Sequence, residues 1–255
     1  MSILFKADHI SVNIAETEIL HDVSLEIQEG ITTCFVGKAG SGKSTLLKTL
    51  AGLILPNNGT VLYKGKNIYA FNKRDELQFR SLCSFAFQDA ALWANQSIYN
   101  NLALPLVIHK PHISKTETDA MVKRVVQRVG YLEGLGFRPA DLSMGEQKLI
   151  SIARCLICEP EVLFLDEPTA SLDQETVERL IQILIEEKKA GKTIIMVTHD
   201  ANLIARIADH ICVVANGSLA TEGPAEKIAP LLGGDLIRKI REYKIQEISL
   251  DDPRR

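Results

Sequence analysis

One segment constrains the fold of this chain more than any other: the glycine-rich run GKAGSGKS at residues 37–44. It follows the apolar run 31–36, which reads as a buried strand, and it precedes the helical pattern that starts at Ser44. Glycines let backbone N–H groups converge on phosphate oxygens, and a helix N-terminus favours an anion. The segment therefore predicts a site for nucleotide phosphates at the edge of an α/β sheet, and in this strand–loop–helix setting a chance glycine-rich turn is the weaker interpretation.

The side chains of this loop suit phosphate chemistry. The Lys43 ammonium group can neutralise the outer phosphates, and the Ser44 hydroxyl can ligate Mg²⁺. The residues expected to contact the nucleotide at this loop are Gly37, Lys38, Ala39, Gly40, Ser41, Gly42, Lys43, Ser44 and Thr45.

A second segment, VLFLD at 162–166 followed by Glu167, delivers two carboxylates to the carboxyl end of a buried strand. Ligands bind at that end of the strands in such sheets. Asp166 suits the shell of a Mg²⁺ ion, and Glu167 can orient or deprotonate an attacking water. Alone, such a pair is most often a helix cap or a turn, but together with the glycine-rich loop it predicts a phosphoryl-transfer site.

Other patterns outline the organisation of the chain. Residues 97–104 and 115–129 have helical spacing, and Ser114 with Glu117 predicts a capping box. The segment 174–190 reads as an amphipathic helix that Gly191 ends, and Asn216-Gly217 reads as a hairpin turn. The expected strands are Phe5–Val12, Val23–Ile27, Ile31–Val36, Thr60–Tyr63, 82–87, 162–166 and 193–198. From about Asp235 a charged helical tail is expected, with an apolar stripe of Leu236, Ile240 and Tyr243.

Composition excludes several classes of function. The 29 basic and 32 acidic residues give a net charge of −3, which argues against nucleic acid as the main partner. No apolar run reaches about 18 residues, and the first ten residues lack the pattern of a secretion signal, so we expect neither a membrane span nor export. Cys155 and Cys158 form a C-x-x-C within an apolar helical run, and we expect a structural role for them rather than metal or redox chemistry.

The segment LSMGE at 142–146 narrows the choice among ATPases and GTPases. It resembles the signature of ABC ATPases, usually LSGGQ, and its setting from 142 to 173 resembles an ABC ATPase throughout. Ser143 and Glu146 also fit a capping box, so the alternative interpretation is a plain helix start. Both hold together if the N–H groups at that helix start bind a γ-phosphate.

Three more pieces resemble the family in position and order. Gln88 resembles the glutamine that contacts Mg²⁺ and water, residues 171–173 resemble the loop that crosses the dimer interface, and His199 resembles the histidine that contacts the γ-phosphate. The resemblance thus implies Glu167, His199 and Gln88 as catalytic residues, and Ser44, Gln88 and Asp166 as metal ligands.

This resemblance covers roughly residues 3 to 230 and implies an architecture. The expected fold is α/β: a P-loop NTPase (RecA-like) core with an N-terminal antiparallel β subdomain and an α-helical subdomain at about 95–158. We expect one ABC ATPase domain over 1–235 and a charged helical tail over 236–255. The expected cofactors are ATP and Mg²⁺. In the family two subunits, copies or homologues, stack head to tail, so Ser143, Gly145 and Glu146 would contact the ATP of the partner.

Several positions depart from the family pattern. Ile14 stands where an aromatic residue usually stacks on adenine, so we expect the phosphates to supply most of the binding energy and ATP to be poorly distinguished from GTP, unless another ring, with Phe5 the nearest candidate, replaces it. Met144 and Glu146 replace a glycine and a glutamine of the signature, Leu149 replaces an arginine, and Lys38 replaces a proline.

One cassette without a heptad run favours a transporter subunit that serves permease chains docking near Gln88 to Leu106. Trp93 would be an anchor for that partner or a core residue. The sequence ALW…IYNNLALPL resembles the ATPases of MCE-type phospholipid systems, and those of amino-acid and lipoprotein transport are nearly as similar. The rival hypothesis is a regulator that moves a partner enzyme. We expect a cytoplasmic location, peripheral on the cytoplasmic face of the inner (plasma) membrane and attached only through the permease.

Overall fold

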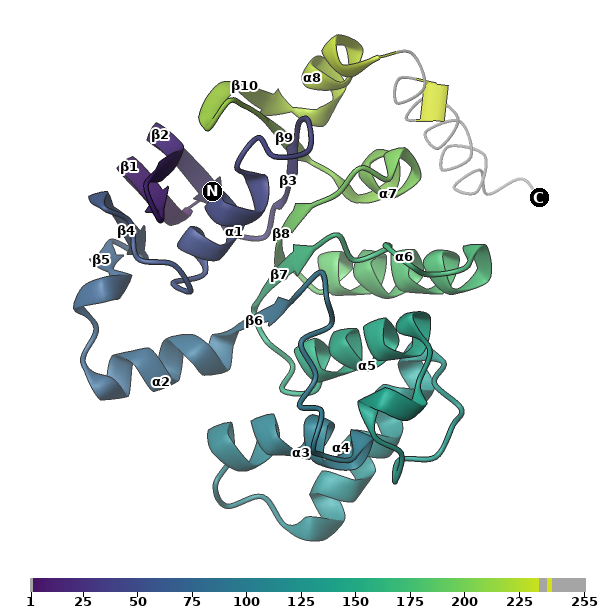
Figure 1. Cartoon of the computed structure of the whole chain (residues 1–255). Coiled ribbons are helices and arrows are strands. Elements are labelled where there is room, and N and C mark those ends of the chain that lie inside the picture. Colours follow the sequence, from purple (N-terminus) through teal and green to yellow (C-terminus); the bar gives the residue numbers. More distant parts are fainter. Residues whose placement is uncertain (1, 234–237, 240–255) are drawn as a thin grey trace, which may run out of the picture.

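The computed structural model describes residues 2–233 and 238–239. Two sheets organise these residues (Figure 1), one with the strand order β10-β9-β3-β8-β7-β6 and one with the order β2-β1-β4-β5. Apart from residues 238–239, the predicted tail 236–255 lies outside the described residues, and so do Leu236, Ile240 and Tyr243 of its predicted stripe.

The six-stranded sheet carries the segments predicted as buried strands. β3 (Thr32–Val36), β7 (Val162–Asp166) and β8 (Thr193–Val197) are buried along their whole length, as expected for central parallel strands covered on both faces. β6 (Cys83–Ala86) pairs in parallel with β7, and β9 (His210–Ala215) pairs in parallel with β3. β10 (Ser218–Pro224) returns antiparallel after the predicted Asn216-Gly217 turn.

The four-stranded sheet is antiparallel and contains β1 (Ile3–Ile14), β2 (Thr17–Gln28), β4 (Asn58–Tyr63) and β5 (Lys66–Asn67). β1 and β2 are longer than predicted, because their pairing runs from Ile3 opposite Gln28 to Ile14 opposite Thr17. Pairing satisfies backbone groups even where polar side chains weaken the apolar pattern. The hairpin therefore extends to the site described below.

The helices begin and end at defined residues. α4 (Lys115–Val129) matches its prediction, and the Ser114–Glu117 capping box is present. α3 (Ile98–His109) continues past the predicted end and includes Pro105. The remaining helices are α1 (Lys43–Leu50), α2 (Lys73–Leu82), α5 (Met144–Leu156), α6 (Gln174–Lys189), α7 (Ala201–Ile207) and α8 (Ala225–Leu232), with 3₁₀ turns at Ile68–Ala70 and Pro139–Asp141.

Two hydrophobic cores lie on opposite faces of the six-stranded sheet. Along β7, Val162 and Phe164 belong to the core shared with α1 and the antiparallel sheet, whereas Leu163 and Leu165 belong to the core shared with α3 to α7. Figure 1 shows α6 and α7 on one side of β7 and β8, with α1 on the other. The layers leave the carboxyl ends of β3, β6, β7 and β8 to build a site, as parallel sheets generally do.

Candidate functional site

The glycine-rich loop between β3 and α1 is held by segments far away in the sequence. The Gly217 N–H of the β9–β10 turn donates to the Ser41 carbonyl oxygen (3.1 Å). A Cβ on Gly37 (φ +149°) would lie 2.1 Å from the Val214 carbonyl oxygen, and one on Gly42 (φ +98°) would lie 2.8 Å from Leu20 Cδ2. Backbone and side chains of β9 and β2 thus require glycine at both positions.

This packing makes Gly37→Ala a severe substitution. Because the obstructing atom is a backbone oxygen, the loop has to move, and we expect a loss of about 1–3 kcal/mol in the free energy of unfolding together with weakened ATP binding. Gly40→Ala is the matched control, since no atom lies within 4 Å of its Cβ position and its φ of +75° alone is strained. Thermal unfolding and ATP titration of both variants test this; equal losses would contradict the packing argument.

Lys43 and Ser44 open α1 at the end of this loop. The Lys43 ammonium is buried and donates to the carbonyl oxygens of Gly37 (2.9 Å) and Lys38 (2.7 Å). Burial lowers the pKa of Lys43, while the nearby Glu167 and Asp166 carboxylates oppose that shift. The amine therefore lies inside the curve of the loop, beside the N–H groups that suit phosphate oxygens.

Asp166 joins the loop to β7, and its surroundings fit Mg²⁺. Its Oδ1 accepts a hydrogen bond from Ser44 Oγ (2.8 Å), whereas Oδ2 is buried with no hydrogen-bond partner and lies 4.0 Å from Lys48 Nζ. A buried carboxylate oxygen without a hydrogen-bond partner, close to a hydroxyl, is the hard-oxygen environment that Mg²⁺ prefers. Ser44 and Asp166 would hold the ion, which would supply charge neutralisation to the phosphates.

Glu167 and His199 meet because their strands are neighbours. Asp166 pairs with Val197 across β7 and β8, and the Glu167 N–H donates to the Val197 carbonyl oxygen (2.9 Å). Glu167 Oε1 lies 3.3 Å from His199 Nε2, and its Oε2 accepts from the His199 backbone N–H (3.4 Å). Burial raises the pKa of Glu167, while His199 opposes the shift. A carboxylate with a raised pKa and a left-handed backbone (φ +46°) suits a general base.

Gln88 lies at the same sheet edge, two residues after Ala86, which pairs with Leu165 of β7. Its side chain is exposed, and its carbonyl oxygen accepts from Lys148 Nζ (3.2 Å). The sequence analysis missed Lys148. Its signal was a cation four residues before Ile152, on the buried stripe of α5, where an apolar residue is expected.

The signature residues lie on α5, apart from the glycine-rich loop. Ser143 caps α5, and its Oγ contacts Glu146 Oε2 (2.6 Å), so the predicted capping box is present. In Figure 1 α5 lies with α3 and α4, away from α1. A Cβ on Gly145 would lie 3.2 Å from the Ser171 carbonyl oxygen, which places the loop 171–173 beside the signature. Within one chain, Ser143, Gly145 and Glu146 are therefore not brought to the phosphate site.

The structure overturns one of the two predictions about adenine stacking. Phe5 is fully buried, with ring centroids 5.0 Å from Tyr63 and 5.5 Å from Phe164, so the proposal that it replaces the adenine-stacking ring is wrong. β1 places it in the core because its side chain points to the inner face of the sheet. Ile14 is 50% exposed at the end of β1, and its contact with adenine stays a prediction.

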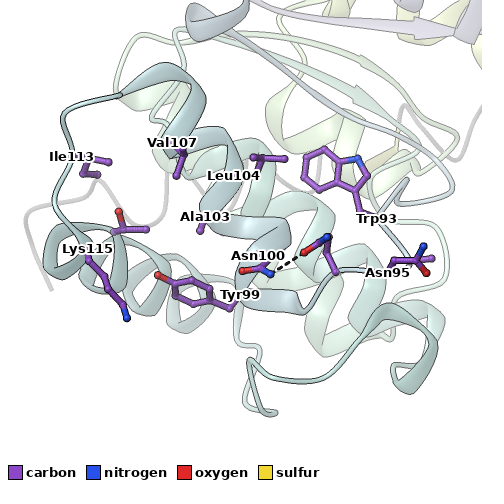
Figure 2. Close-up of a pocket in the computed structure, with 12 residues that line it drawn as sticks. Trp93, Asn95, Tyr99, Asn100, Ala103, Leu104, Val107, Ile113 and Lys115 are labelled. Atoms are coloured by element: carbon purple, nitrogen blue, oxygen red, sulfur yellow. Dashed lines mark hydrogen bonds between the residues drawn. The ribbon is translucent and has the colours of Figure 1, made fainter.

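An apolar groove of about 820 Å³ lies along α3 (Figure 2). Trp93, Leu104 and Val107 line it, and Figure 2 shows Lys115 at the end opposite Trp93. Trp93 is 43% exposed, so the core interpretation is wrong. The Arg154 guanidinium lies 5.2 Å from its ring centroid, which fixes the indole at the rim of the groove.

The cysteines of the C-x-x-C are free thiols. Burial raises the pKa of Cys155 to about 12, which suppresses thiolate chemistry. Within the residues described, the one cluster with metal-ligand potential is His210, Cys212 and Glu222, which includes neither of them. In that cluster Glu222 Oε2 lies 3.5 Å from His210 Nε2 and accepts from Cys212 Sγ (3.4 Å).

Comparison with known proteins gives a consistent result. A family model described as ABC transporter matches residues 20–170. The methionine import ATP-binding protein MetN 1 of Pseudomonas putida is 33% identical over 88% of this chain and 68% of its own length. The ABC transporter ATP-binding protein YtrE of Bacillus subtilis is 36% identical over 72% of this chain and 80% of its own. The sulfate/thiosulfate import ATP-binding protein CysA of Mesostigma viride is 35% identical over 99% and 70%.

Solved structures agree with these relatives. The dimeric structure of a bacterial ABC transporter cassette superposes with a TM-score of 0.80 at 28% identity, covering 87% of this chain and 99% of that one. A dimeric cassette in a post-hydrolysis state bound to ADP and Pi gives a TM-score of 0.81 at 27% identity, with the same coverage. The chain spans 62–68% of the length of two methionine import relatives that it matches.

Proposed function

The chain belongs to the ABC transporter family and is an ATPase, and from this premise we propose that it energises a separate membrane permease by dimerising on ATP. The proposal rests on one observation: the residues of the phosphate site and those of the signature lie on different elements. Four residues converge at one sheet edge, whereas Ser143 and Met144 of the signature are exposed at the start of α5. The four are Lys43, Ser44, Asp166 and Glu167.

The exposed signature supports a dimer. Met144, at the start of α5, is 73% exposed, and Ser143 beside it is exposed too. A helix start with accessible N–H groups attracts an anion, and the γ-phosphate bound to a second copy would supply it. Two of the solved cassettes that superpose on this chain are dimeric.

The groove along α3 supports a permease partner. It is lined by exposed apolar side chains, which a monomeric surface rarely gathers in one concave patch. We expect a short helix of the permease to place its apolar face there, with Trp93 as the anchor. The groove adjoins the segment that begins at Gln88, so its occupant would lie close to the catalytic edge.

No helix among the described residues is long and apolar enough to cross a bilayer.

The experiment captures the native partner with the tagged chain, wild type or Leu104→Glu, from detergent-solubilised membranes of its own cell. A carboxylate in the apolar groove should reduce capture of a multi-span protein by at least about tenfold, which corresponds to about 1.4 kcal/mol. Leu55→Glu is the matched control, because Leu55 is exposed outside the groove. A partner bearing only an enzymatic or scaffold domain would support the regulator hypothesis, and equal loss with both variants would refute docking in the groove.

The relatives do not support the phospholipid assignment, since two of the three named above carry methionine import or sulfate/thiosulfate import in their names and the third names no cargo. We therefore propose import of a small polar solute, with an amino acid as the first candidate. Uptake of radiolabelled methionine and sulfate by vesicles containing the captured complex tests this. Transport of neither solute, with ATPase stimulated by another cargo, would overturn the proposed substrate class.

A further inference from the structure

Lys148 is a buried cation that binds three backbone carbonyls at once. Its side chain is 2% exposed, and its Nζ donates to the carbonyl oxygens of Phe87 (2.9 Å), Gln88 (3.2 Å) and Asp166 (3.2 Å). An ammonium group has three N–H donors, so each proton has one acceptor. Two of these acceptors belong to the segment that follows β6, and the third ends β7.

We propose that Lys148 is a positioning residue for ATP hydrolysis, which holds the backbone at Gln88 at a fixed place relative to the carboxyl end of β7. Gln88 has no register partner of its own, because the β6–β7 pairing ends at Ala86 and Leu165. Beyond the last paired residues of β6 and β7, the hydrogen bonds from Lys148 connect the two segments. These bonds thereby set the distance between Gln88 and the carboxylates of Asp166 and Glu167. Lys148 itself touches no reacting atom in this role.

A second cation of α5 extends the same attachment toward the groove. Arg154 donates to the carbonyl oxygens of Ala90 (3.0 Å) and Ala91 (2.9 Å) and lies against the Trp93 ring. Residues 87–91 are thus held by one rigid helix that also begins with the signature. The part of the proposal that concerns Lys148 requires only ATP hydrolysis, so it stands or falls independently of the proposed permease.

The experiment measures kcat, KM for ATP and the thermal unfolding of the wild type, Lys148→Met and Lys148→Gln, with Lys189→Met as an exposed-lysine control. We expect Lys148→Met to lower kcat by about 10- to 100-fold with a smaller change in KM, because misplacement affects the reacting geometry more than phosphate binding. Lys148→Gln should recover part of kcat, since its amide donates two hydrogen bonds. A merely structural lysine would lower the unfolding temperature without lowering kcat more than it changes KM.

Three results would overturn the proposal. An unchanged kcat in folded Lys148→Met would show that the bridge does not position the site. Equal losses of kcat in folded Lys148→Met and Lys148→Gln would show that hydrogen-bond donation to these carbonyls does not control the rate. Should Lys148→Met not fold, Lys148→Gln decides, and a wild-type kcat in that variant, which lacks one of the three donors, would refute the role.

Discussion

Glu167→Gln is expected to leave ATP binding intact and to reduce kcat by about 10²–10⁴-fold. The carboxylate lies 3.3 Å from His199 Nε2 at the carboxyl end of β7, and burial raises its pKa, so it can accept a proton from an attacking water. The amide keeps the size and a hydrogen bond to water but cannot accept that proton. ATP should then persist in the site.

The same variant should accumulate an ATP-bound dimer. Since hydrolysis would no longer separate the subunits, size-exclusion chromatography with light scattering should show twice the monomer mass in ATP and Mg²⁺, and the monomer mass without nucleotide. Glu161→Gln is the matched control, because Glu161 lies just before the opposite end of β7 and is exposed. Full ATPase activity in Glu167→Gln would move the catalytic role to another residue.

Lys43→Ala is expected to weaken ATP binding by at least about 100-fold, which corresponds to about 3 kcal/mol. Two effects contribute. The substitution removes the buried ammonium inside the loop, and it deletes the hydrogen bonds to the Gly37 and Lys38 carbonyl oxygens that hold the loop in its curve. Titration with a fluorescent ATP analogue measures the dissociation constant, with Lys66→Ala on β5 as an exposed-lysine control. Unchanged affinity would refute the phosphate-site assignment.

Mixing extends this prediction to the dimer. Chains with Lys43→Ala and chains with Ser143→Arg should each be inactive alone, because one lacks the phosphate cation and the other obstructs the signature. A mixed dimer retains one intact composite site if the signature acts on the ATP of the partner. Activity that returns on mixing supports that arrangement, whereas mixed dimers without activity would contradict it or show that one site is insufficient.

The local sequence was enough to predict those parts of the site that lie within one short segment each. The glycine-rich loop, Lys43, Ser44, Asp166 and Glu167 lie where strand and helix patterns placed them, because the burial of β3, β7 and β8 on both faces leaves a plain apolar signature. The capping boxes at Ser114 and Ser143 were equally local. The family resemblance added Gln88 and His199, whose isolated patterns carry little information.

Only the tertiary structure decided which side chains are buried and which distant segments meet. Phe5 and Trp93 look alike as candidate rings, yet one packs inside the core and the other lies at the rim of a groove. Gly37 is required by the carbonyl of Val214, and Lys148 is bound by carbonyls of β7 and of the segment after β6. The physical reason is that a chain pattern specifies the face of an element, whereas burial and backbone contact depend on which element packs against that face.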